Sequence, residues 1–305
     1  MLLLTDTFGI PYIYYERFFS RRFRYFSKIL DCILFLIFVS KYIMNPNVFI
    51  LGAPCVRNRF VSLLLNKKYI IYLRCLHSNG EKLTYLSDKV DAFFKKFGIN
   101  NRLTNPYMAR CHLVTSKQTE KFLKFRKAGN NIIDIGAIWL KNRILKKKSQ
   151  SEFQKRKVYF ISQAFAEHDF LDAQFEQENF VKNLSSFLLK ENLELIIKKH
   201  PRDYHAYNGF TLFNGNADKF LESISQDDIV VSFFSTLGFE ISLLGGDVKF
   251  VSLPSLKEVY NPLYIQNNVK FYEGFDLDFS FLFDEKVTYS VFSQVECIDI
   301  NRIIY

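Results

Sequence analysis

The sequence Leu-Glu-Leu-Ile-Ile-Lys-Lys-His-Pro-Arg occupies residues 193–202 and predicts a short buried strand that stops at a cationic loop. The apolar run has the length of a strand, and the proline prevents it from continuing as a central strand. In open α/β sheets, ligands bind outside the carboxyl ends of the strands. We therefore expect an anionic ligand to meet the residues at this edge, which are Lys198, Lys199, His200, Pro201 and Arg202.

The residues around this strand alternate between apolar runs and amphipathic helices. We expect strands at 158–161, 193–198, 210–213, 229–234 and 248–253, and helices at 175–190, 217–225 and 235–244. Apolar strands separated by helices of this length indicate a parallel sheet that is covered on both faces. The C-terminal part of the chain is therefore predicted to be Rossmann-like.

The N-terminal part has a similar but less regular pattern. Strands are expected at 1–5, 48–52, 69–73, 112–115 and 132–136, and helices at 16–43, 83–97 and 117–127. The polar, lysine-rich segment 141–157 is the best candidate for a linker. The sequence thus predicts an α/β protein with two Rossmann-like halves and a cleft between them, formed by residues 1–145 and 155–305.

Composition and charge narrow the class of protein. Among 305 residues, 49% are hydrophobic and 24% are charged, as in a globular protein. The net charge of +10 favours anionic partners, namely a nucleotide sugar, nucleic acid or an acidic membrane surface. No nucleic-acid-binding module is recognisable, so nucleic acid is not expected as a partner. The sequence does not indicate an oligomeric state.

Two further patterns concern the environment of the protein. Five cysteines without a Cys-x-x-Cys spacing argue against a disulfide framework or a zinc site and fit a reducing, cytoplasmic compartment. The apolar run 29–39 is too short to cross a bilayer, which takes about 20 residues. It is either a buried helix or, because arginines precede it, a helix that contacts an anionic membrane surface peripherally.

His200, Ser235 and Thr236 are the first candidates for chemistry. A histidine at the carboxyl end of a strand can donate a hydrogen bond to a phosphate or act as a general acid. Ser235 and Thr236 lie between the strand 229–234 and a helix, whose first amide groups attract phosphate. Serine and threonine also cap helices without any ligand. We expect this turn to lie beside the loop of His200.

Three carboxylates are candidates for a general base. Glu167 and Asp169 flank His168 in the loop after the strand 158–161, and Asp6 lies just before Gly9. Each of them can equally serve as a turn or capping residue. The sequence contains no Gly-x-Gly-x-x-Gly, no phosphate-binding loop of the Walker type and no His-Glu-x-x-His.

A strand that ends in Lys-x-His-Pro, followed some 35 residues later by a strand that leads into Ser-Thr, resembles the bacterial sialyltransferases of lipooligosaccharide and capsule synthesis and, more distantly, the polysialyltransferases. Ser162-Gln163-Ala-Phe-Ala-Glu167 is similar to the family's strand-Gln-Pro-Leu-x-acid segment, with Ala164 where the family often has proline. The resemblance covers about residues 155–255. The family's acidic-acidic-Gly motif is not intact in this chain.

The resemblance implies a GT-B fold, with 1–145 on the acceptor side and 155–305 binding the nucleotide sugar. It implies CMP-sialic acid as donor, inversion at the anomeric carbon, no required metal, and a galactoside of a bacterial surface glycan as acceptor. His200, Ser235 and Thr236 would contact the donor phosphate. The residues that flank His200, which are Lys198, Lys199, Pro201 and Arg202, would also bind the donor, with Gln163 close by. Compared with that family, the N-terminal domain of this chain looks short, so we expect the chain to be shortened at its N-terminus. Another CMP-activated acid such as Kdo, a nucleotide-diphosphate sugar, and a degenerate binding protein remain alternatives.

Overall fold

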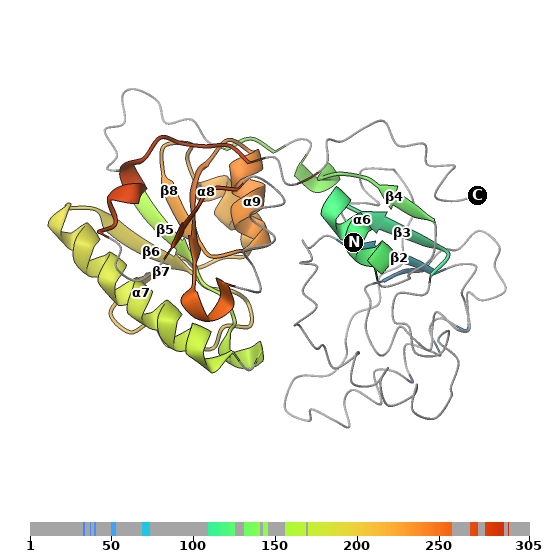
Figure 1. Cartoon of the computed structure of the whole chain (residues 1–305), viewed down its shortest axis with the longest axis horizontal. Helices are drawn as coiled ribbons and strands as arrows, with labels where there is room; N and C mark the ends of the chain where they lie inside the picture. The colour runs from blue at the N-terminus through green and yellow to red at the C-terminus, as the bar shows by residue number, and fades with distance from the viewer. Residues whose placement is uncertain are drawn as a thin grey trace. The chain divides into compact units, whose positions relative to one another are not determined.

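The described residues fall into two compact units, one that ends at Leu140 and one that runs from Arg143 to Phe292. The computed structural model describes residues 33, 37, 40, 50–52, 69–73, 109–125, 131–140, 143–145, 156–168, 170–257, 269–273, 278–289 and 292. Each unit is built on its own parallel sheet (Figure 1).

The first unit contains a four-stranded parallel sheet in the order β1-β2-β3-β4. The strands are β1 (Ile50–Gly52), β2 (Tyr69–Leu73), β3 (Cys111–Val114) and β4 (Ile132–Asp134). The helix α6 (Lys117–Phe125) connects β3 to β4, and a short 3-10 helix, η1 (Ile138–Leu140), follows β4. Parallel pairing requires such a crossover, because a tight turn joins only antiparallel strands.

The second unit contains a six-stranded parallel sheet in the order β7-β6-β5-β8-β9-β10. The strands are β5 (Lys157–Ile161), β6 (Glu194–Lys198), β7 (Thr211–Leu212), β8 (Ile229–Ser232), β9 (Asp247–Ser252) and β10 (Phe271–Glu273). In chain order within this unit, the strands run 3-2-1-4-5-6 across the sheet. This is the doubly wound Rossmann order.

Helices cover both faces of this sheet. They are α7 (Leu171–Lys190), α8 (Ala217–Ser223) and α9 (Thr236–Leu243), with short 3-10 helices η2 (Ala166–His168), η3 (Pro254–Leu256) and η4 (Ser280–Phe283). In β5, Phe160 contacts Phe180 of α7, whereas its neighbour Tyr159 packs edge-on against Phe220 of α8. Successive side chains of a strand point to opposite faces, so α7 and α8 lie on opposite sides of the sheet.

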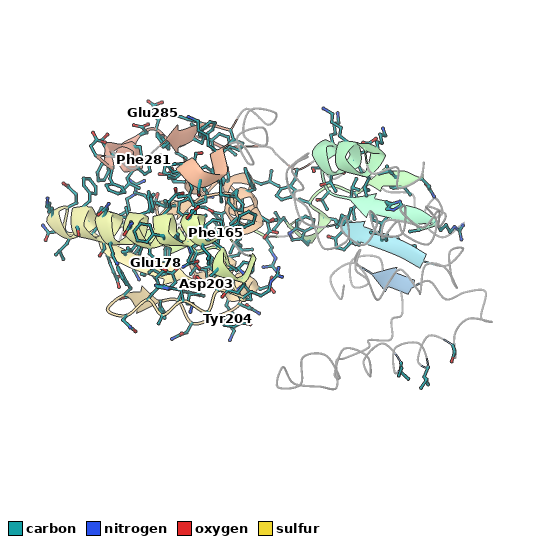
Figure 2. The ribbon with its side chains drawn as sticks, turned by 60° about the horizontal axis from the view of Figure 1, so that its bottom comes forward. Phe165, Glu178, Asp203, Tyr204, Phe281 and Glu285 are labelled. Atoms are coloured by element: carbon teal, nitrogen blue, oxygen red, sulfur yellow. The ribbon has the colours of Figure 1, made fainter. Side chains whose placement is uncertain are left out.

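Aromatic side chains fill the core on the α7 face. Phe233 contacts both Phe160 and Phe180, with ring centroids 5.4 and 5.5 Å apart. Each fully buried phenylalanine of this kind contributes about 1.5–3 kcal/mol through removal of its ring from water. Figure 2 shows side chains packed on two sides of α7, with Phe281 above the helix and Asp203 below it.

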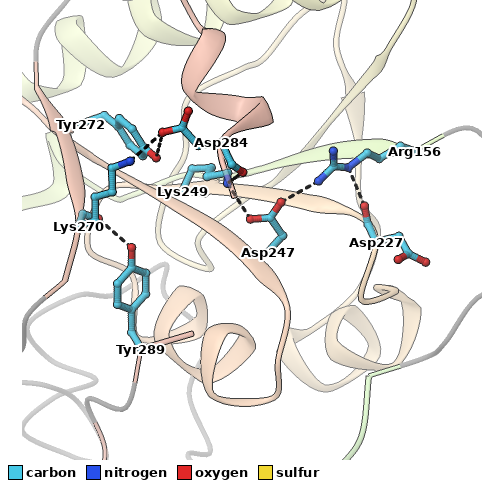
Figure 3. A network of polar contacts seen from close by, with 8 residues as sticks. All are labelled: Arg156, Asp227, Asp247, Lys249, Lys270, Tyr272, Asp284 and Tyr289. Atoms are coloured by element: carbon cyan, nitrogen blue, oxygen red, sulfur yellow. Dashed lines mark hydrogen bonds and ion pairs between the residues drawn. The ribbon is translucent and has the colours of Figure 1, made fainter. Parts of the chain in front are cut away.

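A polar network joins the start of the sheet to the segment after β10 (Figure 3). Asp247, at the start of β9, accepts a hydrogen bond from Arg156 Nη2 at 2.7 Å and pairs with Lys249 Nζ at 3.0 Å. Lys249 also donates to the carbonyl oxygen of Asp284 at 2.7 Å. The side chains of Asp247 and Lys249 are each 3% exposed. The network lies mainly at the amino ends of β5 and β9, away from the edge where ligands bind to such sheets.

Most of the predicted elements that the structure describes are confirmed. The predicted strands 158–161, 193–198, 229–234 and 248–253 correspond to β5, β6, β8 and β9. The predicted helix 175–190 begins four residues too late, and β10 was not predicted. Of the predicted helix 16–43, the residues described are 33, 37 and 40, and all three are helical. The predicted strand 1–5 and helix 83–97 lie outside the described residues.

Candidate functional site

The carboxyl ends of β5, β6 and β8 meet at one edge of the second sheet. β5 lies at the centre, with β6 on one side and β8 on the other. The chain winds in opposite directions from β5, so this is the topological switch point, where doubly wound sheets bind ligands. That the turn of Ser235 lies beside the loop of His200 stays a prediction: the two follow β8 and β6, whose carboxyl ends lie at this edge with β5 between them.

The loop after β6 carries His200 and is held by buried polar contacts. The His200 N–H donates to Ser162 Oγ at 3.0 Å, and the His200 carbonyl oxygen accepts from the Asp203 N–H at 2.9 Å. Ser162 Oγ donates in turn to Asp203 Oδ2 at 2.5 Å. Tyr207 Oη donates to the same carboxylate oxygen at 3.0 Å, and the His205 N–H donates to Asp203 Oδ1 at 3.0 Å.

The His200 imidazole is half-buried and has a defined orientation. Its Nδ1 accepts a hydrogen bond from the Arg202 N–H at 3.2 Å. A neutral imidazole has one donor and one acceptor nitrogen, so this contact assigns the proton to Nε2. An Nε2–H at the carboxyl edge of a sheet can donate to a phosphate oxygen.

The two lysines before His200 contact protein carbonyl groups. Lys198 is buried, its Nζ donates to the Lys199 carbonyl oxygen at 3.0 Å, and burial lowers its pKa. Lys199 Nζ donates to the His205 carbonyl oxygen at 2.6 Å and lies 5.7 Å from the centroid of the Tyr207 ring. Both lysines therefore stabilise the loop. Pro201 and Arg202, further along it, are exposed.

The α7 helix contributes a second set of contacts to this loop. Glu178 Oε1 lies 3.0 Å from His205 Nδ1, and the His205 ring packs edge-on against Tyr207 with centroids 4.7 Å apart. Figure 2 labels Glu178 on α7, with Asp203 and Tyr204 of the loop below it. The loop is thus attached to β5 on one side and to α7 on the other.

Ser235 and Thr236 begin α9 at the end of β8. Ser235 is the N-cap, since its Oγ accepts from the Leu237 N–H at 3.2 Å, and its own N–H donates to Ser232 Oγ at 3.3 Å. Gly238 lets the helix approach the sheet closely, because a Cβ atom at this position would lie 3.2 Å from atoms of Ser232 and Phe250. The amino end of α9 is therefore fixed at the same edge as the His200 loop.

Gln163 and Glu167 follow β5 at this edge, and each has a buried polar atom without a hydrogen-bond partner among the described residues, Gln163 Nε2 and Glu167 Oε2. The Gln163 backbone is fixed by the side-chain amide of Gln177 on α7, at 2.8 and 3.0 Å. Glu167 Oε1 accepts from the Tyr204 N–H at 3.0 Å, which links Glu167 to the loop of His200.

The other two predicted carboxylates, Asp6 and Asp169, lie outside the described residues, and the structure does not describe the side chain of His168. The residues that sequence analysis missed are Ser162, Gln177, Asp203 and Tyr207. Ser162 begins one predicted motif and Asp203 directly follows another, so their positions were a usable signal. The contact between them spans 41 residues and needed the structure.

Two features are absent from the described parts of the chain. Within them, there is no cluster of three or more His, Cys, Asp or Glu residues that could hold a metal ion. Nor do they include a helix with the length and apolar character needed to cross a bilayer.

Comparisons with known proteins identify a family and a fold. A family model described as alpha-2,8-polysialyltransferase matches residues 74–253, which is more than half of the chain. No curated protein matches the chain by sequence.

Among solved structures, MnaA of S. aureus, solved with UDP, is similar at 13% identity and a TM-score of 0.51, covering 88% of this chain and 72% of that one. UDP-GlcNAc 2-epimerase of Methanocaldococcus jannaschii, solved with UDP-GlcNAc and UDP, has 10% identity and a TM-score of 0.45, covering 88% and 76%. The similarity to MnaA and the two parallel sheets confirm the predicted GT-B-like α/β fold class.

Proposed function

This chain belongs to the alpha-2,8-polysialyltransferase family and is a sialyltransferase-type glycosyltransferase, and we propose that it transfers sialic acid from CMP-sialic acid to a glycan acceptor with inversion at the anomeric carbon. The observation that carries this proposal is the family match over 74–253. That range includes β5, β6 and β8 and every predicted site residue except Asp6.

The proposed chemistry is a direct displacement. An acceptor hydroxyl oxygen attacks the anomeric carbon of sialic acid while the bond from that carbon to the CMP phosphate oxygen breaks. A carboxylate takes the hydroxyl proton, and His200 Nε2–H donates to the departing phosphate oxygen. The Nδ1 contact with the Arg202 N–H supports this role, because it leaves the proton on the other nitrogen.

The amino end of α9 supports a phosphate site next to His200. Ser235 and Thr236 lie at the first turn of this helix, and the free amide groups of a helix N-terminus favour an anion. With His200 and these groups as donors, we expect the reaction to need no metal. Transfer that persists in excess EDTA agrees with this proposal, and transfer restored only by a divalent cation contradicts it.

Glu167 is the best-supported of the three candidate bases. Its backbone follows β5 at the switch point, and its carboxylate contacts the loop of His200 through the Tyr204 N–H. One oxygen of that carboxylate is buried and has no hydrogen-bond partner among the described residues. Asp6 and Asp169 remain proposals from sequence.

The family description concerns an α2,8 linkage, in which the accepting hydroxyl belongs to a sialic acid. We therefore propose that a sialylated bacterial surface glycan is the acceptor, with the unsialylated galactoside predicted from sequence as the alternative. We also propose that the chain acts at the inner face of the membrane, where such a glycan would be made. Co-sedimentation with anionic vesicles but not with neutral ones tests that peripheral contact.

The first experiment measures donor class and transfer together. Stabilisation against heat by CMP, but not by UMP, GMP or UDP, indicates a CMP-activated donor, since a ligand at 100 times its Kd stabilises by about 2.7 kcal/mol. CMP-sialic acid is then offered with a fluorescent lactoside and with its sialylated counterpart, and products are identified by mass spectrometry. Stabilisation by UDP alone, or transfer from a UDP-sugar but not from CMP-sialic acid, contradicts the proposed donor.

A further inference from the structure

We propose that Ser162 and Asp203 form a buried polar clamp that positions His200 through its backbone, so that the imidazole presents Nε2–H to the departing group. The clamp is defined as the Ser162 hydroxyl, the Asp203 carboxylate and the hydrogen bond between them. The catalytic consequence rests on the proposed function, but the positioning itself is a property of the protein without substrate.

Asp203 is the centre of the clamp. It is 4% exposed, and its carboxylate accepts three hydrogen bonds, from Ser162 Oγ, Tyr207 Oη and the His205 N–H. A carboxylate can only accept, so these groups all point their hydrogens at it. Such a buried charge is stable only when it is hydrogen-bonded in this way. Asp203 therefore fixes the direction of the Ser162 hydroxyl hydrogen.

Ser162 transmits this orientation to His200. It is fully buried at the carboxyl end of β5, where its N–H donates to the Lys198 carbonyl oxygen at 3.1 Å. Its one hydroxyl hydrogen is committed to Asp203, so its lone pairs are left for the His200 N–H at 3.0 Å. Because the Ser162 hydroxyl donates its hydrogen to Asp203, its oxygen can act only as an acceptor toward the His200 N–H.

His200 is consequently held at both backbone polar groups. Its N–H contacts Ser162, and its carbonyl oxygen accepts from the Asp203 N–H. With the backbone fixed, the Arg202 N–H lies where it can donate to Nδ1. The clamp is unlike a Ser-His-Asp triad, because Asp203 contacts the histidine through its backbone and through Ser162 Oγ, and none of the three side chains is a nucleophile.

The alternative, that these contacts only stabilise the loop, explains the arrangement less completely. The loop has other attachments, including the Lys199 contact with the His205 carbonyl and the Glu178 contact with His205. The Ser162 hydroxyl, by contrast, joins the carboxylate to the one residue proposed to act on the leaving group. Small displacements of such a group reduce rates strongly, about a hundredfold for about 1 Å.

The test compares Ser162→Ala with Tyr207→Phe. Both variants remove one hydroxyl donor from Asp203 Oδ2, but only Ser162→Ala removes an acceptor from His200. Ser162→Cys keeps a donor and an acceptor at this position, both weaker than those of serine, and serves if the alanine variant folds poorly. Tyr207→Phe keeps the ring that packs on His205 and is the matched control.

The first readout requires no substrate. Histidine labelled with 15N reports which ring nitrogen is protonated, and His200→Ala identifies the signal of His200 among the five histidines. At about pH 8.5, where an ordinary imidazole is neutral, the wild type and Tyr207→Phe should show a single Nε2–H form. Ser162→Ala should show an averaged mixture of both forms. A single Nε2–H form in Ser162→Ala overturns the proposal.

The second readout is transfer activity. Ser162→Ala should lower kcat about 10- to 100-fold, and Ser162→Cys should lower it by a smaller factor. Tyr207→Phe should stay within about twofold of the wild-type kcat. In a His200→Ala background, Ser162→Ala should have no further effect, because residues that act through one group are not additive. If the losses of kcat caused by Ser162→Ala and His200→Ala multiply in the double variant, the clamp is overturned. If the wild type does not use CMP-sialic acid at all, the proposed function fails, and the imidazole signal alone decides the clamp.

Discussion

Replacement of Lys249 by methionine should destabilise the second unit without affecting its ligand-binding edge. Lys249 Nζ is buried between Asp247 Oδ1 at 3.0 Å and the Asp284 carbonyl oxygen at 2.7 Å. Removing one partner of a buried ion pair costs about 3–5 kcal/mol, because the other charge is left uncompensated. Arg156 still donates to Asp247 in this variant, so the loss should lie near the lower end, about 3 kcal/mol.

Urea unfolding followed by circular dichroism measures this loss as a lower midpoint with an unchanged slope. The chain offers a matched control in Lys270, which pairs with Asp284 Oδ2 at 2.8 Å but whose side chain is 53% exposed. Lys270→Met should hardly move the midpoint, since exposed pairs contribute little. The reasoning about burial is refuted if both variants shift the midpoint equally, or if Lys249→Met leaves it unchanged.

Three other predictions concern the site and the pH dependence of stability. Joint replacement of Ser235 by alanine and Thr236 by valine should weaken CMP binding about 10- to 100-fold, as expected for lost hydrogen bonds to a charged phosphate; unchanged affinity by calorimetry would eliminate the phosphate site. Among alanine variants of the three candidate carboxylates, Glu167→Ala should lower kcat about 10²- to 10⁴-fold; wild-type rates for that variant would exclude it as the base. Burial raises the pKa of Tyr159 from 10.0 to about 12. The unfolded tyrosine ionises first as pH rises, so its contribution to stability is complete below pH 10 and is lost toward pH 12. Tyr159→Phe should therefore flatten the alkaline fall in the free energy of unfolding, and an unaltered slope in urea titrations at pH 9–12 would contradict this.

The strands and helices of the second unit could be predicted because their periodicity is local. The apolar runs of β5, β6 and β8 are bounded by polar or turn residues and gave nearly correct limits. The start of α7 was missed for a physical reason. Its N-cap, Phe170, makes no side-chain capping contact, and its first residue, Leu171, is 70% exposed, so neither a capping residue nor a buried stripe marks the beginning.

The order of the strands and the contacts across them could not be predicted in the same way. Local pattern gives each strand but does not say that β5 lies between β6 and β8. His200 and Ser235 were identified from their residue types at strand ends. Asp203 was not predicted as a site residue, because an aspartate close after a proline is common in turns. Its burial depends on the contacts with Ser162 and Tyr207, which the sequence does not show.

The central position of β5 has a consequence for synthesis of the chain on the ribosome. The Lys157 N–H at the start of β5 donates to Asp228 Oδ1 just before β8, 71 residues later. At about 5–20 residues per second, roughly 4–14 s pass between the two. During that interval one side of β5 has unpaired backbone groups and an apolar surface, which is the kind of exposed edge that pairs with other chains. A nascent chain paused before residue 229 should therefore need a chaperone more than one released after β8.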